Sequence, residues 1–277
     1  MRTVFSIAIV GATVLGLAVG AGYVFQRNLI YLPTPGPLPA ASDVLPGGQD
    51  VTLHTADGLE LSAWFFPAGG RQDHDPQAPA VLVAPGNGGN RSMRVPLAEQ
   101  LTRRGMSVLL MDYRGYAANE GKPSEDGLAR DVRAARGYLV EQARVRQDRL
   151  LYFGESLGCG VVSELATEHP PAGMVLRSPF SELAETAAHH YPFLPVRTLL
   201  KDRYPVVDNV RALSATPVRV VYGDADSIIP PEQSRAVAEA AGTEPVVVGG
   251  ADHNDRVLLH GTAVVQTVRE LAQSATS

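Results

Sequence analysis

A serine flanked by glycines is the first candidate for chemistry in this sequence. Gly154-Glu155-Ser156-Leu157-Gly158 follows a short apolar run and precedes a stretch with helical spacing. The pattern predicts a strand-to-helix turn so tight that small residues are needed on both sides of Ser156, because the strand and the helix nearly touch. Such a turn lifts the serine hydroxyl above the sheet edge, where it can act as a nucleophile. The alternative is an ordinary strand–helix turn, and partner residues elsewhere in the chain must distinguish the two.

A serine nucleophile needs a base that accepts its proton and a carboxylate that orients the base. With the nucleophile on such a turn, the expected chain order is serine, then acid, then histidine. Asp226 and His253 satisfy this order, and each follows directly after a predicted strand. The carboxyl ends of parallel strands meet at one edge of a sheet, so both side chains can converge on Ser156. Asp224 is a competing acid; we favour Asp226 and interpret Asp224 as a turn former.

The reaction also needs two N–H donors for the negative charge that develops on the attacked carbonyl oxygen. The backbone N–H of Leu157, at the start of the predicted helix, is one candidate. The second is the N–H of Asn87, in the glycine-rich loop Pro85-Gly86-Asn87-Gly88-Gly89-Asn90. Phosphate binding is the competing interpretation of this loop, but the loop has neither Gly-Lys-Ser/Thr nor a G-x-G-x-x-G pattern.

Strand and helix patterns alternate along most of the chain, which predicts an α/β fold with a mainly parallel sheet covered by helices on both faces. Before the alternation, two β-rich runs around Ala56-Asp57-Gly58 predict a hairpin. A long insertion at residues 179–217, here called the lid, interrupts the alternation. The predicted strands are 50–54, 59–66, 80–84, 107–111, 149–153, 173–176, 218–222 and 245–248, and the predicted helices are 92–104, 124–142, 157–168, 232–241 and 254–271.

The N-terminal stretch Val4 to Phe25 carries no charge. As a helix it would span about 33 Å, enough to cross a bilayer core, so we expect residues 1–27 to form a single-pass membrane anchor. A cleaved signal peptide is the alternative. Two positive charges, Arg2 and the α-amine, precede the apolar stretch, and one, Arg27, follows it. Because the more positive side of a membrane segment tends to stay in the cytoplasm, this slightly favours an extracytoplasmic catalytic domain. Residues 28–48 then read as a proline-rich linker and 49–277 as the catalytic domain, and the prolines of Pro33 to Pro39 are expected to exclude sheet pairing there.

Composition narrows the possible partners. The 277 residues are 45% hydrophobic with a net charge of −5, so nothing suggests a nucleic-acid partner. The single cysteine, Cys159, excludes an intrachain disulfide and reads as a small buried residue. No side chains have metal-ligand spacing, so neither a metal nor an organic cofactor is expected.

Taken together, these motifs resemble those of membrane-anchored serine hydrolases of the α/β-hydrolase fold, close to serine aminopeptidase-like and lysophospholipase-like members. The resemblance covers roughly residues 26 to 270. The motifs that carry it are Gln26 to Pro33, Pro85 to Asn90, Asp112 to Tyr116, Gly121 to Glu125, Gly154 to Gly158, Arg177 to Phe180, Gly223 to Asp226 and Asp252 to Asn254.

By this resemblance, Ser156 is the nucleophile, Asp226 the acid and His253 the base, and the backbone N–H groups of Asn87 and Leu157 form the oxyanion hole. Two departures stand out. Pro85-Gly86 replaces the usual His-Gly before the oxyanion residue, and Ala117-Ala118-Asn119 replaces a stretch that is usually rich in glycine and serine.

The expected activity is cleavage of carboxylic esters or thioesters, with a small-molecule acyl ester or lipid as substrate and an acyl-enzyme intermediate. The predicted anchor and the apolar lid residues Tyr191, Pro192, Phe193 and Leu194 favour lipophilic acyl groups. A peptidase on the same fold is one alternative, which an acidic cluster in the lid would favour; Glu182, Glu185 and Asp202 are candidates. An inactive, membrane-tethered binding protein is the other.

Overall fold

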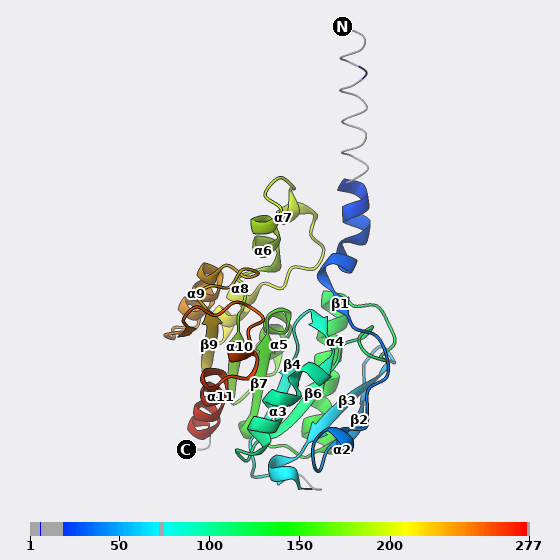
Figure 1. Cartoon of the computed structure of the whole chain (residues 1–277), viewed down its shortest axis with the longest axis vertical. Helices are drawn as coiled ribbons and strands as arrows, with labels where there is room; N and C mark the ends of the chain where they lie inside the picture. The colour runs from blue at the N-terminus through cyan, green and yellow to red at the C-terminus, as the bar shows by residue number, and fades with distance from the viewer. Residues whose placement is uncertain (1–5, 7–18, 72–74, 276–277) are drawn as a thin grey trace.

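The computed structural model describes residues 6, 19–71 and 75–275. Their centre is an eight-stranded sheet in the order β10-β9-β8-β7-β4-β6-β3-β2 (Figure 1). Six neighbouring strands are parallel, while β3 runs antiparallel to β6 and β2 antiparallel to β3. The α/β-hydrolase fold is thereby confirmed at the level of the sheet. The strands are β2 (Gln49–His54), β3 (Glu60–Phe66), β4 (Ala80–Ala84), β6 (Ser107–Met111), β7 (Leu150–Glu155), β8 (Gly173–Arg177), β9 (Val218–Gly223) and β10 (Val246–Val248).

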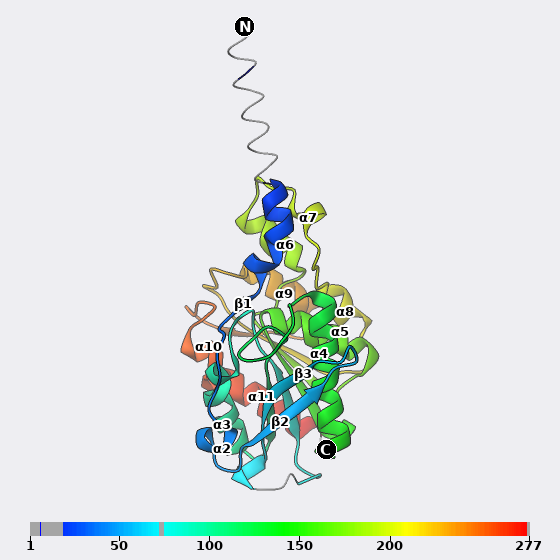
Figure 2. The ribbon, with the colours of Figure 1, turned by 90° about the vertical axis from the view of Figure 1, so that its right-hand side faces the viewer.

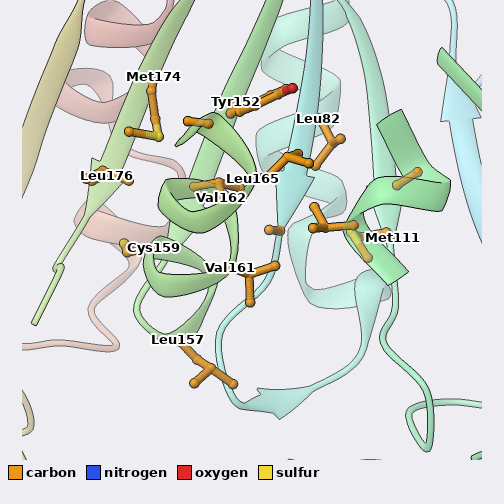
Figure 3. Close-up of a cluster of buried hydrophobic side chains, with 14 of the residues drawn as sticks. Leu82, Met111, Tyr152, Leu157, Cys159, Val161, Val162, Leu165, Met174 and Leu176 are labelled. Atoms are coloured by element: carbon orange, nitrogen blue, oxygen red, sulfur yellow. The ribbon is translucent and has the colours of Figure 1, made fainter. Parts of the chain in front are cut away.

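Helices cover both faces of the sheet. The first face packs against α4 (Glu125–Gly137), α5 (Leu157–Glu168), α8 (Val206–Ala212) and α9 (Pro231–Ala240). The second packs against α2 (Ala41–Val44), α3 (Val95–Thr102), α10 (Arg256–His260) and α11 (Thr262–Ser274). Alternate residues of a strand serve opposite faces: Leu82 lies in the first core, and Val81 and Val83 lie in the second. Figure 3 shows the first core where α5 meets the strands.

Several predicted helices differ from the observed ones at their ends. Helix 157–168 has the predicted bounds, and Ser124 caps α4 as expected, accepting a hydrogen bond from the N–H of Gly127 at 3.1 Å. The helix predicted over 254–271 is two helices, because the chain is extended at Gly261. A side chain there would lie 2.2 Å from the Val257 carbonyl oxygen, so only glycine permits this close break.

The predicted linker is more ordered than its prolines suggested. β1 (Leu32–Pro33) pairs in parallel with β5 (Gly88–Gly89), in the loop that carries Asn87. The expectation that prolines exclude sheet pairing here is wrong, because the donors are the neighbours of Pro33. Leu32 N–H donates to Asn87 O at 2.9 Å, and Thr34 N–H donates to Gly89 O at 3.1 Å. The linker is therefore fastened to the candidate oxyanion loop.

The lid stands above the carboxyl ends of the parallel strands. It contains α6 (Leu183–His190) and α7 (Val196–Leu199), whereas α8 packs beside α5 against the body of the domain. Residues 19–30 are helical. Figures 1 and 2 both show this N-terminal helix, in blue, rising beside α6 and α7.

Most of the predicted anchor, residues 1–5 and 7–18, lies outside the described residues. Among the residues that are described, no helix combines the length and the apolar character needed to cross a membrane. The anchor therefore stays a prediction from the sequence.

Candidate active site

Ser156 lies at the junction of β7 and α5, as the glycine pattern predicted. Its backbone is strained, with φ 50° and ψ −112°, a conformation seen mainly at functional sites. The flanking glycines explain why the turn can close. A side chain at Gly158 would lie 2.1 Å from the Ala84 carbonyl oxygen, and one at Gly154 would lie 2.7 Å from the Cα of Cys159. The ordinary-turn alternative therefore does not describe this junction.

The structure brings the three predicted side chains together in one buried line. His253 Nε2 lies 3.1 Å from Ser156 Oγ, and His253 Nδ1 lies 2.7 Å from Asp226 Oδ2. These residues are 97 and 27 positions apart in the chain. With Nδ1–H donated to the carboxylate, Nε2 is free to accept the serine proton.

The surroundings of Asp226 favour its ionised form, which is the form that can pair with the imidazole of His253. Its Oδ1 accepts the N–H groups of Ile228 and Ile229 at 3.0 and 2.8 Å. Burial works to raise the pKa of Asp226, but the hydrogen bond and charge of His253 and these two N–H groups outweigh it, and the pKa lies below its ordinary value. The competing acid, Asp224, instead accepts the Gly250 N–H at 2.6 Å at an exposed turn.

The two candidate oxyanion residues reach the same cavity as Ser156. Leu157 opens α5 directly after the serine, and Asn87 lies across from it in the glycine-rich loop. The loop is held in place from two sides. Asn87 Nδ2 donates to the Ile30 carbonyl at 2.8 Å, and the Asn87 carbonyl accepts the Tyr116 hydroxyl at 2.7 Å. Both backbone N–H groups thus belong to rigid elements beside the nucleophile.

A cavity of about 720 Å³ opens above Ser156. Its volume lies within the usual range for small-molecule sites. Its walls come from the lid, from the start of α5, and from the N-terminal helix, and apolar side chains such as Leu29, Phe180 and Ile229 dominate them. No group of three or more potential metal ligands occurs among the described residues.

Comparison with known proteins places the chain in a family. Residues 75–207 match the family described as "Serine aminopeptidase, S33". The chain is 50% identical over 249 residues to the uncharacterized protein Rv2307c of Mycobacterium tuberculosis, covering 88% of this chain and 86% of that one. The chain belongs to this family of α/β-hydrolases. A second relative is the uncharacterized protein YfhR of Salmonella typhi, 31% identical over 255 residues, covering 86% of this chain and 82% of that protein.

Solved structures support the α/β-hydrolase fold. The Pyrococcus furiosus esterase Pf2001 superposes with a TM-score of 0.70 at 19% identity, covering 90% of this chain and all of the esterase chain. Est1E from Butyrivibrio proteoclasticus superposes with a TM-score of 0.63 at 19% identity, covering 82% and 98% of the two chains. At these identities the likeness concerns the fold.

Behind the candidate nucleophile of this α/β-hydrolase lies an ion network that the sequence interpretation missed. Glu155 accepts a hydrogen bond from Arg94 Nε at 3.1 Å and lies 3.0 Å from Arg177 Nη2. Arg94 also donates to the carbonyls of Gly88 and Asn90. Arg177 donates to the His253 carbonyl at 2.7 Å. The network therefore joins the serine turn, the oxyanion loop and the histidine loop.

Glu155 is ionised within this network although it is fully enclosed. Burial works to raise its pKa, but the charges of Arg94 and Arg177 outweigh it and lower the pKa to about 2. One signal in the sequence pointed here: a charged residue, Glu155, ends an otherwise apolar strand, and Arg177 ends the neighbouring one. Charges at such positions are rarely buried without partners.

Proposed function

We propose that this protein is a serine hydrolase that cleaves carboxylic esters or thioesters of lipophilic acyl groups through an acyl-enzyme. The observation that carries the proposal is the continuous hydrogen-bonded line from Asp226 through His253 to Ser156, which ends at the floor of an apolar cavity. A strained serine, a histidine in contact with it and a buried carboxylate are the parts that acyl transfer requires.

In the proposed reaction, Ser156 Oγ forms a bond to the acyl carbonyl carbon while its proton passes to His253 Nε2. The carbonyl oxygen becomes an oxyanion held by the N–H groups of Asn87 and Leu157. The intermediate collapses, the leaving alcohol or thiol takes the proton from His253, and the acyl group stays on Ser156. Water then attacks the acyl carbon while His253 accepts its proton. The bond to Ser156 Oγ breaks, His253 returns the proton to Oγ, and the carboxylic acid departs. Asp226 stabilises the imidazolium in both halves.

The structure favours an esterase over a peptidase that recognises a free amine. Such a peptidase would need a carboxylate available in the lid. Glu182 pairs with Arg203, Glu185 pairs with Arg197 at 2.7 Å, and Asp202 pairs with Arg27 at 2.8 Å. All three candidate carboxylates are thus already neutralised by arginines.

We further propose that residues 1–27 anchor the enzyme in a membrane with the catalytic domain on the extracytoplasmic side. The support is the uncharged stretch from Val4 to Phe25 and the charge asymmetry across it. The exposed apolar side chains of Val24 and Phe25, on the N-terminal helix outside the cavity wall, also support a lipid environment for this helix.

The test is hydrolysis of a series of p-nitrophenyl esters by the purified full-length protein and by Ser156→Ala, combined with labelling by a fluorophosphonate probe. We expect the wild type to hydrolyse the esters and to label, and Ser156→Ala to lose labelling and nearly all hydrolysis. Equal hydrolysis by the two proteins would show that the assignment of the nucleophile is wrong. A wild type that neither labels nor hydrolyses would favour the inactive binding protein.

A further inference from the structure

The N-terminal helix supplies one long wall of the cavity above Ser156. The residues that contribute are Val19, Gly22, Tyr23, Gln26, Leu29 and Ile30. Their spacing of three and four places them along one face of the helix. The opposite wall is α6 and α7, through residues such as Ala187 and Val196. The cavity is therefore a slot between two helical elements.

One end of this slot is fixed at the reacting serine. The Ile30 carbonyl, at the last helical residue, accepts the side-chain N–H of Asn87 at 2.8 Å. Asn87 in turn lines the cavity together with Ser156. The carboxyl end of the N-terminal helix is thus tied to the candidate oxyanion loop, and Val19 and Gly22 mark the far end of the slot.

The wall has little polarity to offer a ligand. Its one amide side chain, Gln26, is already engaged: its amide N–H groups donate to the carbonyls of Tyr23 and Leu199, and its oxygen accepts the Lys201 N–H at 2.7 Å. The ion pair between Arg27 and Asp202 joins the helix to the lid. It lies outside the slot, because Arg27 does not line the cavity. What faces the slot from the helix is therefore chiefly hydrocarbon.

The length of the slot fits one fatty acyl chain. At a rise of about 1.5 Å per residue, the helical residues 19–30 extend about 17 Å. A bilayer core of about 30 Å holds two leaflets of acyl chains, so one chain is about 15 Å long. We propose that the N-terminal helix is a specificity element of the active site: the acyl chain lies along it from Ser156 toward Gly22, and the substrate is a long, single-chain acyl ester. This inference rests on the proposed hydrolase activity.

The proposal separates long from short substrates. A short acyl group reaches only the end of the slot near Ser156, whereas a long one needs the far end beside Gly22. A side chain at Gly22 has open space, with no atom within 4 Å of its Cβ position. Gly22→Trp would place an indole at the far end of the slot, with open space at its Cβ. Gly20 also has open space but does not line the cavity, so Gly20→Trp is a matched control on the same helix.

The experiment measures kcat/KM of the full-length protein for p-nitrophenyl palmitate and p-nitrophenyl butyrate in the same detergent micelles. Displacing about two methylene groups from the apolar wall corresponds to about a tenfold change, so Gly22→Trp should lower the palmitate-to-butyrate ratio about tenfold. Gly20→Trp should leave the ratio at its wild-type value. Ala187→Trp, which fills the slot from the α6 side, should reproduce the effect of Gly22→Trp. The same change of ratio from substitutions on two different helices would show that it comes from the slot and not from misfolding of one variant.

Two outcomes would be read differently. If the wild type hydrolyses both esters and the ratio is unchanged in both Gly22→Trp and Ala187→Trp, the acyl-wall proposal is overturned while the hydrolase assignment stands. If the wild type does not exceed Ser156→Ala on either ester, the proposed function itself is overturned.

Discussion

At the scale of single residues, the geometry around Ser156 depends on charges that never contact a substrate. Glu155 precedes the candidate nucleophile and contacts both Arg94, which holds the candidate oxyanion loop, and Arg177, which holds the His253 backbone. A buried ion pair stabilises little by its presence, but removing one partner strands the other charge, at a cost of about 3–5 kcal/mol. Glu155 therefore aligns three loops that are far apart in the sequence.

Substitution of Glu155 should change how the free energy of unfolding depends on pH. The pKa of Glu155 falls from an ordinary 4.5 to about 2 on folding, so its charge stabilises the folded state above pH 4.5, and this contribution is lost as the pH falls toward 2. We expect Glu155→Gln to be less stable than wild type at pH 6, with the difference shrinking between pH 4.5 and 2. Denaturant unfolding at several pH values measures this. A difference that stayed constant over that range would contradict an ionised Glu155.

The identity of the catalytic acid can be tested with two aspartates of the same loop, Asp224 and Asp226. Asp226→Asn preserves the shape of the side chain but favours the wrong histidine tautomer, so kcat for an ester should fall about 10³- to 10⁴-fold. Asp224→Asn, at the exposed turn to Gly250, should change kcat less than about twofold because it touches no proposed catalytic group. Steady-state kinetics of both variants decides between them; a larger loss in Asp224→Asn would reverse the assignment.

The position of a site residue could be predicted from the sequence where a local pattern, such as the end of a strand, fixes it. Ser156, Asp226 and His253 each follow a strand, and parallel strands bring their carboxyl ends to one edge, so their convergence could be expected. The meeting of Glu155 with Arg177 was indicated in part, because the two residues end neighbouring strands. The pairing of Arg94 with Glu155 could not be predicted, because it depends on a loop 61 positions away in the chain. Nothing local to an arginine indicates which buried carboxylate it will meet.

At the scale of elements, the contact between the N-terminal helix and the lid is the main addition to the predicted fold. Arg27 donates two hydrogen bonds to Asp202, at 2.9 and 2.8 Å, across 175 positions of sequence. Tyr31 also donates to Asp202 at 2.9 Å. The Asp202 side chain is 3% exposed whereas that of Arg27 is 46% exposed, so the carboxylate is shielded from water and the guanidinium is only partly shielded.

Breaking this contact should loosen the helix from the lid. Arg27→Met leaves the buried Asp202 with only Tyr31 among these two partners, and hydrogen bonds to charged groups contribute about 1.5–3 kcal/mol. We expect faster amide hydrogen exchange in residues 26–31 and 199–204 and a loss of unfolding free energy near the lower end of that range, because water screens the half-exposed guanidinium. Glu185→Gln, which breaks an exposed ion pair with Arg197 elsewhere in the lid, is the control and should cost less than about 1 kcal/mol. Equal effects of the two variants would show that the contact does not hold the helix.

The sequence predicted the elements better than their arrangement. The sheet strands and α5 follow from apolar runs and from the Gly-x-Ser-x-Gly turn. The break at Gly261 and the pairing of Leu32–Pro33 with the oxyanion loop depend on what lies beside them in space. The N-terminal helix, interpreted only as an anchor, also lines the cavity through Gln26, Leu29 and Ile30, because its lower turns extend down to the lid.

At the scale of the whole molecule, the cavity and the predicted anchor share one end. The N-terminal helix rises past α6 and α7 (Figures 1 and 2). Two large apolar side chains of these segments are exposed: Phe25 on the N-terminal helix at 60%, and Phe193 in the turn between α6 and α7 at 78%. The sheet and its covering helices lie below. An anchored molecule would therefore present its substrate slot toward the bilayer surface and its compact domain toward water.

The charges that flank the N-terminal apolar stretch predict its orientation across the membrane. Arg2 and the α-amine outweigh Arg27, which favours a cytoplasmic N-terminus and an extracytoplasmic domain. The only cysteine, Cys159, is buried, and burial raises the pKa of its thiol, so it should not react with maleimides. A single exposed cysteine, Glu244→Cys, therefore reports the position of the domain. We expect a membrane-impermeant maleimide to label this variant in intact cells and to leave the wild type unlabelled. Labelling of Glu244→Cys only after lysis would place the domain in the cytoplasm and reverse the predicted orientation.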